Sequence, residues 1–204
     1  LPTGLAIVGV SEKVQYQIQN VSRRPGDTYL GCGYFDFANM INANEGGYFP
    51  YTPAATLLRG LRTSVDMLLE EGLDNVFARH TRLANGVRAA VDAWGLKNCA
   101  QSPDIFSDTV TAIMVGDGYD ANMVIQTAYK KYGVSLGAGL SKVAGKVFRI
   151  GHLGWLNETM VLQALGGAEL AMRDVGIDFE AGSGVGAAIK LYSQSPKEMA
   201  MAAE

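Results

Sequence analysis

"GKVFRIGHLG", residues 145–154, sets one arginine in the middle of an apolar run. The pattern predicts a short strand in which Phe148 and Ile150 flank Arg149. Glycines at both ends of the run let other backbone segments come close to it. An arginine does not lose its charge in proteins, so burying it without an anion is very costly. The question is therefore whether Arg149 meets an internal carboxylate or an anion that arrives from solution.

Two interpretations of Arg149 stay open on this ground. The first is a structural ion pair with an acid such as Asp108 or Glu169. The second is a substrate carboxylate, which suits the planar, bidentate fork of an arginine held on a rigid strand. His152 faces the opposite side of the strand and is expected to be a packed structural residue, whereas His80 is expected to be exposed or at an interface.

Helical and strand patterns extend outward from this stretch. The helical period is clear on both sides of Gly72, which indicates two amphipathic helices or one bent helix. Residues 28–53 are rich in aromatics, Gly and Asn, and we expect a long ordered loop there. The other predicted elements are strands at 5–10, 108–115, 134–139 and 145–154, and helices at 12–22, 120–132 and 157–175.

The segment "GGYFPYTP", residues 46–53, is a second candidate site. Thr52 is expected to be the N-cap of the following helix, with Pro53 at its first position. A helix N-terminus with a hydroxyl at the cap is able to bind a phosphate. The alternative is a hydrophobic turn capped by a threonine.

Composition excludes several classes of function. The 204 residues carry a net charge of −3 without a cluster of Lys or Arg, which argues against nucleic acid. No apolar run reaches the roughly 18 residues that a membrane span needs. Cys32 and Cys99 show no metal-binding spacing, and two isolated histidines do not form a metal site, so free thiols in a reduced compartment are expected. The glycine-rich segments lack the spacing of a P-loop or a dinucleotide fingerprint.

Six blocks of sequence carry a resemblance to a known family. They are "LPTGLAIVGVS", "GGYFPYTPAATLLRGLR", "EEGLDNVFARH", "AVDAWGLKNCA", "TVTAIMV" and "GKVFRIGHLG", in this order. Together they resemble the C-terminal half of a class V pyridoxal-phosphate aminotransferase. The nearest group is serine–glyoxylate aminotransferase with its alanine–glyoxylate and aspartate–glyoxylate relatives. The resemblance runs from Leu1 to about Ala188.

The resemblance implies an α/β fold, the C-terminal part of a fold type I aminotransferase. Residues 1–72 would be the end of the large cofactor-binding domain, with a dimer-interface loop and a linking helix. Residues 73–182 would form the small α/β C-terminal domain, and residues 183–204 a tail.

The resemblance also implies roles for individual residues. Arg149 would bind the α-carboxylate of the amino or keto acid, and Thr52 the cofactor phosphate of the neighbouring subunit of a homodimer. Relatives carry a tyrosine where Phe49 stands, so Tyr51 or Tyr48 would provide the second phosphate contact. The lysine that holds pyridoxal 5'-phosphate would precede Leu1, so none of the catalytic residues lies in this chain.

The implied reaction moves an amino group from L-serine to glyoxylate and gives glycine and hydroxypyruvate. Alanine or aspartate as donor remains an alternative, because each presents the same α-carboxylate to Arg149. A non-catalytic α/β module for dimerisation or ligand binding is a further alternative. We expect a cytoplasmic location, since the end "MAAE" is not a peroxisomal address.

Overall fold

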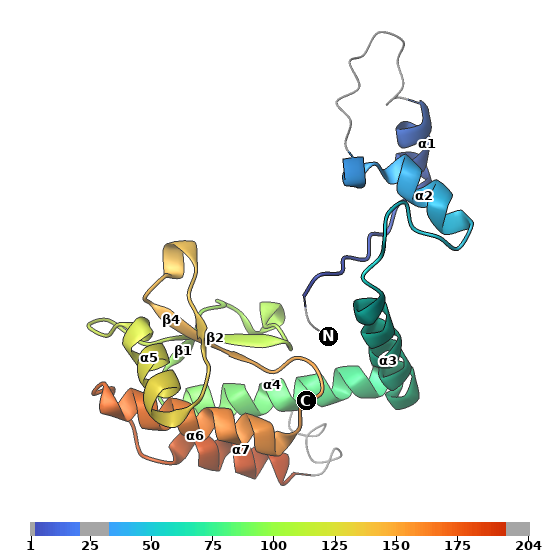
Figure 1. Ribbon diagram of the computed structural model, residues 1–204. Helices are drawn as coiled ribbons and strands as arrows, with labels where there is room; N and C mark the ends of the chain where they lie inside the picture. Colours follow the sequence, from blue (N-terminus) through green and yellow to red (C-terminus); the bar gives the residue numbers. More distant parts are fainter. Residues whose placement is uncertain (1–2, 21–32, 195–204) are drawn as a thin grey trace. The chain divides into compact units, whose positions relative to one another are not determined.

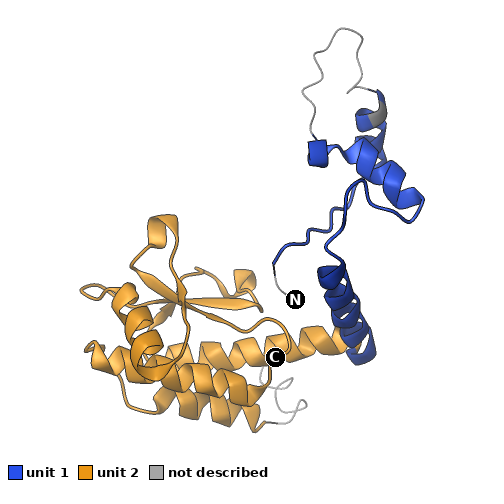
Figure 2. Cartoon of the chain, viewed as in Figure 1, with its two compact units in different colours: residues 1–71 blue, residues 72–204 orange. Residues whose placement is uncertain are grey.

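The computed structural model describes residues 3–20 and 33–194 and divides the chain into two compact units, Leu1–Glu71 and Gly72–Glu204 (Figure 2). Gly72 separates helix α3 (Ala55–Glu71) from helix α4 (Leu73–Ala93). Its φ of 81° lies in the left-handed region, where a Cβ would be strained. Two helices rather than one bent helix therefore form on the two sides of this glycine.

The regular elements described in the first unit are all helices. It contains α1 (Glu12–Asn20), the 3₁₀ turn η1 (Gly33–Phe35), α2 (Phe37–Glu45) and α3. The helix predicted at 12–22 is confirmed for residues 12–20, and its last two residues lie outside the described part. The apolar stripe of α3 contains no fully buried residue, and Leu69 is 67% exposed.

Two expectations for this unit are wrong. Residues 5–10 do not form a strand, because the described part of this unit offers them no partner strand, and Ile7 is 80% exposed. The segment expected as a long loop contains helix α2. The carboxylate of Asp36 starts this helix by accepting hydrogen bonds from the N–H groups of Ala38 (2.9 Å) and Asn39 (3.2 Å). Residues 28–32 of the expected loop, including Cys32, lie outside the described residues.

The second unit combines helices with a four-stranded sheet (Figure 1), as expected for a mixed α/β domain. After α4 its elements are β1 (Lys97–Asn98), η2 (Pro103–Ile105), β2 (Val110–Met114), α5 (Ala121–Tyr132), β3 (Gly137–Ala138), η3 (Ser141–Val143), β4 (Val147–Gly151), α6 (Glu158–Asp174) and α7 (Ser183–Tyr192). The strand order is β1-β2-β4-β3, and every pair is antiparallel.

Side-chain caps and a glycine set the helix boundaries in this unit. Asn157 accepts a hydrogen bond from the N–H of Met160 at 3.1 Å and caps α6. Asp120 caps α5 in the same way through the N–H of Asn122 at 2.8 Å. Gly133, with φ of 67°, ends α5 in the left-handed conformation. These caps fix the connections on both sides of β3 and β4.

The sheet has one covered face and one open face. Thr111 and Ile113 of β2, together with Phe148 and Ile150 of β4, are at most 2% exposed. They point toward the helices, which Figure 1 shows on one side of the sheet. The alternate residues lie on the other face, where Ala112 and Arg149 are only half-buried but Val147, at the start of β4, is 1% exposed.

Helix α7 corrects the expectation of a tail from residue 183. It packs against α4 and α6, and Ala188 is completely buried. The approach is close because Gly184 has no side chain: a Cβ there would lie 2.3 Å from Nε1 of Trp94. The small residues Gly184 and Ala188 thus allow one helix to pack tightly on another.

Candidate functional site

Arg149 lies in the centre of β4, on the open face of the sheet. Its cross-strand neighbours are Ala112 on β2 and Gly137 on β3. Both neighbours are small, so neither side chain covers the guanidinium group. The Nε of Arg149 donates a hydrogen bond to the carbonyl oxygen of Ala138 at 2.9 Å. Neither Nη group of Arg149 has a hydrogen-bond partner among the described residues.

No carboxylate pairs with Arg149 among the described residues. Asp108 instead binds Arg88, with 2.7 Å between Nη2 and Oδ1, and accepts a hydrogen bond from Thr81 at 2.6 Å. Burial raises the pKa of Asp108, but the hydrogen bonds from Thr81 and Arg88 outweigh it, so the net pKa is below the usual value. Asp108 is therefore not the partner of Arg149.

Glu169, the other acid considered, lies in the core of the second unit. It accepts hydrogen bonds from the indole of Trp94 and from three backbone N–H groups at the start of α7. The carboxylate is thus fully engaged in holding three helices together. Glu169 is therefore not the partner of Arg149 either.

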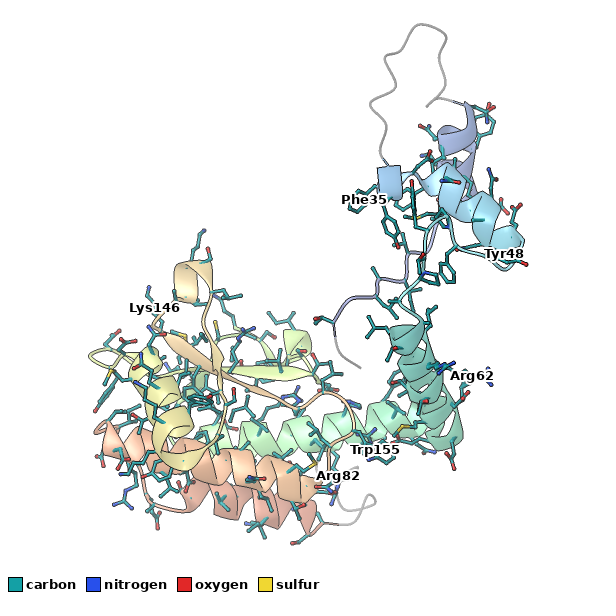
Figure 3. All side chains as sticks on the ribbon, viewed as in Figure 1. Phe35, Tyr48, Arg62, Arg82, Lys146 and Trp155 are labelled. Carbon is teal, nitrogen blue, oxygen red and sulfur yellow. The ribbon has the colours of Figure 1, made fainter. Side chains whose placement is uncertain are left out.

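The residues Thr52, Tyr51 and Tyr48 lie together in the first unit. They line an open cavity of about 680 Å³ with the rest of residues 47–53. Tyr48, labelled in Figure 3, is 75% exposed, and Tyr51 is 50% exposed. None of the three hydroxyl groups has a hydrogen-bond partner among the described residues. The cavity therefore offers three hydroxyl donors to a ligand.

The expected role of Thr52 as an N-cap is wrong. Helix α3 begins at Ala55, and the N–H of Leu58 donates to the carbonyl of Ala54, which takes the capping position. The N–H of Ala55 bonds to the carbonyl of Pro53 at 2.9 Å, so the chain makes a tight turn before the helix. Thr52 consequently lies outside the helix.

A cluster of aromatic side chains accompanies this cavity. The ring of Tyr34 lies 5.6 Å from that of Tyr51 and 6.0 Å from that of Phe35. Phe35 is 79% exposed, and Tyr34 is 58% exposed. The sequence shows that this region is rich in aromatic residues, but the contact between Tyr34 and Tyr51 depends on the fold.

Both histidines are buried. His152 is fully buried between the hydroxyl group of Thr111 (2.9 Å from Nε2) and the carbonyl of Asp108 (3.0 Å from Nδ1), which confirms its structural role. Burial lowers its pKa, and the hydrogen bond to Asp108 opposes this only in part. His80 is only 8% exposed, so the expectation that it is exposed is wrong, and the alternative of an interface stays a prediction.

The reason for the burial of His80 is the loop after β4. The Nε2 of His80 accepts a hydrogen bond from the N–H of Gly154 at 3.0 Å, and Nδ1 lies 2.7 Å from the carbonyl of Val76. Arg79 also donates to the carbonyl of Gly154, at 2.8 Å. Helix α4 thus holds the end of the segment that contains Arg149.

The described residues contain no group of histidine, cysteine and acidic side chains arranged to bind a metal ion. Cys99 is a free thiol. Over the same described ranges, no helix combines the length and apolarity that crossing a bilayer demands.

Comparison with known proteins relates the chain to aminotransferases. It is 55% identical over 202 residues to a serine–glyoxylate aminotransferase of Hyphomicrobium methylovorum, covering 99% of this chain and 49% of that protein. It is 48% identical over 195 residues to an L-aspartate–glyoxylate aminotransferase of Paracoccus denitrificans, covering 96% of this chain and 48% of that protein. No family model matches the chain.

The fold leads to the same group of proteins. A crystal structure of ureidoglycine–glyoxylate aminotransferase from Bacillus subtilis superposes with a TM-score of 0.71 and 28% identity, over 76% of this chain and 41% of that chain. The chain spans about half the length of the curated relatives it matches. Over nearly all of its own length, the chain is therefore similar in sequence to serine–glyoxylate and L-aspartate–glyoxylate aminotransferases.

Proposed function

We propose that this chain forms the C-terminal half of a pyridoxal-phosphate-dependent aminotransferase that transfers an amino group from L-serine to glyoxylate. The observation that carries the proposal is Arg149, a strand arginine without an acidic partner among the described residues, on the open face of the sheet. The 55% identity to a serine–glyoxylate aminotransferase supports the choice of reaction. The products are glycine and hydroxypyruvate.

The guanidinium of Arg149 binds the α-carboxylate of both substrates. A planar fork with two Nη groups matches the two oxygens of a carboxylate, and charge-assisted hydrogen bonds of this kind are stronger than neutral ones. Donor and acceptor both carry this carboxylate, so one arginine serves both halves of the reaction. Its contribution is to orient the substrate, which lowers the entropic part of the barrier.

The cavity lined by residues 47–53 has the donor set that a phosphate group needs. We assign Thr52 to the phosphate of pyridoxal 5'-phosphate, with Tyr51 or Tyr48 as the second hydroxyl donor. Phe49 has no hydrogen-bonding group and contributes only apolar surface. When bound, the cofactor supplies the carbonyl carbon that carries the amino group between the substrates and a ring that accepts electron density.

A cytoplasmic homodimer completes the proposal. The exposed aromatic side chains of the first unit, among them Tyr34 and Phe35, support an interface between subunits, since aromatic residues are enriched there. The free thiol of Cys99 is compatible with a reducing compartment. In this arrangement Thr52 contacts the cofactor of the neighbouring subunit.

The test is a chimaera in which this chain replaces the 202 aligned residues of the Hyphomicrobium methylovorum relative. We expect it to form glycine and hydroxypyruvate from glyoxylate and L-serine. The unaltered relative is the control for assay and expression. Faster turnover with L-alanine or L-aspartate would change the assigned donor, and a folded, cofactor-loaded chimaera without any transamination would contradict the proposal.

A further inference from the structure

Glycine at position 137 is not required by the backbone. Residues with positive φ include many glycines of this chain, but Gly137 is not among them, so other residues would fit its backbone conformation. It lies within β3, where a glycine weakens a strand and normally marks the close approach of another group. The reason for a glycine at position 137 should therefore be found in the atoms that a side chain there would contact.

The group that approaches Gly137 is Arg149. A Cβ on Gly137 would lie 3.2 Å from the Cβ of Arg149 and 3.3 Å from its Nε. These distances are tighter than most real Cβ contacts, so with a side chain at position 137 the arginine would have to shift by a few tenths of an ångström. The missing side chain lets the stem of Arg149 lie across β3 and reach the carbonyl of Ala138.

The bond to Ala138 decides which nitrogens of Arg149 are left for a ligand. The single hydrogen of Nε is used at 2.9 Å, and no hydrogen bond from either Nη group is found among the described residues. A carboxylate that approaches Arg149 is therefore bound by Nη1 and Nη2, end-on, and not by Nε and one Nη. Anchoring the guanidinium before the ligand arrives also reduces the ordering cost of binding.

We propose that β3 is a positioning device for Arg149: Gly137 gives the arginine its path and the Ala138 carbonyl fixes its Nε, so that both Nη groups bind the substrate carboxylate end-on. This inference rests on the proposed function, which assigns the carboxylate to Arg149. Gly137 does not touch the substrate. It acts through Arg149.

The experiment is a double-mutant cycle in the chimaera with Gly137→Val and Arg149→Lys. The probe is α-methyl-L-serine, which lacks the hydrogen on Cα and is not transaminated. Its dissociation constant is measured from the absorbance of the bound cofactor. Gly166→Ala is the matched control, since a Cβ on this glycine of α6 meets no atom within 4 Å.

We expect Gly137→Val to raise the dissociation constant about tenfold and Gly137→Ala to raise it less, as overpacking grows with side-chain size. KM for L-serine and for glyoxylate should rise with it, with less change in kcat. In the Arg149→Lys background, Gly137→Val should change the dissociation constant less than about twofold, because no anchored guanidinium remains to be displaced. Cofactor affinity should be the same in all variants.

The outcomes separate this inference from the proposed function. Equal effects of Gly137→Val in both backgrounds, or no effect in the wild-type background, would overturn the positioning role while leaving the proposed function intact. An Arg149→Lys chimaera that binds the probe as tightly as the wild type would overturn both. If Gly137→Val does not fold, Gly137→Ala decides by the same criteria. A crystal structure of the complex with the probe carboxylate on Nε would also overturn the end-on geometry.

Discussion

Trp94 and Glu169 are joined by a hydrogen bond of 2.9 Å from the indole Nε1 to the carboxylate Oε1 in the core of the second unit. The same oxygen accepts the N–H groups of Gly184 at 2.8 Å and Val185 at 3.1 Å, and Oε2 accepts that of Gly182 at 3.0 Å. One carboxylate on α6 thus satisfies the first turn of α7 and the end of α4. Its negative charge also lies at the favourable, N-terminal end of α7.

Glu169→Ala should destabilise the chain by about 3 kcal/mol, since it leaves four donors without an acceptor in a buried place. Glu169→Gln keeps one acceptor oxygen and should cost less. Urea unfolding followed by circular dichroism measures both free energies. Equal stability of the alanine variant and the wild type would show that α7 does not depend on this carboxylate.

Thr52→Val should weaken the binding of pyridoxal 5'-phosphate to the chimaera by about 1–3 kcal/mol, because one hydrogen bond to a charged acceptor is lost. Thr63→Val is the control, since the hydroxyl group of Thr63 bonds to the carbonyl of Arg59 within α3. Titration of the cofactor-free protein by absorbance gives both affinities. Unchanged affinity in Thr52→Val would remove this residue from the phosphate site.

Arg149→Lys should lower kcat/KM for both L-serine and glyoxylate, because a point charge replaces the planar fork. The loss should correspond to about 2–4 kcal/mol of transition-state stabilisation. Cofactor affinity should barely change. Arg62→Lys, in an exposed pair with Asp66 on α3, is the control and should behave as the wild type. A variant that loses cofactor but keeps its affinity for the amino acid would identify Arg149 as a structural residue.

The stability of the chain should fall as the pH drops below about 6.5, because the pKa of His152 is lower in the folded state than in the unfolded chain. Between these two pKa values the unfolded chain binds more protons than the folded chain. The stability that His152 contributes is therefore fully present above its unfolded pKa and is lost as the pH falls toward its folded pKa. Asp108, whose pKa is also lowered, titrates at more acidic pH and does not interfere.

Urea unfolding at about pH 7.5 and about pH 5.5 tests this dependence in the wild type and in His152→Gln. The variant should be less stable at the higher pH, since it loses the bonds to Thr111 and Asp108, but its stability should change less between the two conditions. The same pH dependence in both proteins would exclude His152 as its source.

Phe35→Ser should weaken the dimer of the chimaera about tenfold, since aromatic side chains are enriched at interfaces and the loss of one that anchors the interface costs more than about 1 kcal/mol. Tyr129→Ser is the control: Tyr129 is similarly exposed, at 67%, but lies on α5 of the second unit. Sedimentation equilibrium measures both dissociation constants. A fully active monomer would contradict the proposed homodimer.

The sequence by itself determined those features of the fold that depend on neighbours along the chain. The helices on both sides of Gly72 and the alternation around Arg149 are visible in it because hydrophobic periodicity acts over a few residues. The resemblance to aminotransferases was visible for the same reason, since it rests on short blocks in a constant order.

Tertiary structure alone decided the features that need partners far away in the sequence. Residues 5–10 have the composition of a strand, but no described strand lies beside them to pair with. Helix α7, expected as a tail, packs against α4 and donates backbone hydrogen bonds to Glu169. The hydrogen bond from Arg149 to the carbonyl of Ala138 also depends on the tertiary structure. Only the register of β3 on β4 brings Gly137 and the Ala138 carbonyl to its side chain, because antiparallel pairing, not sequence distance, sets which residues meet.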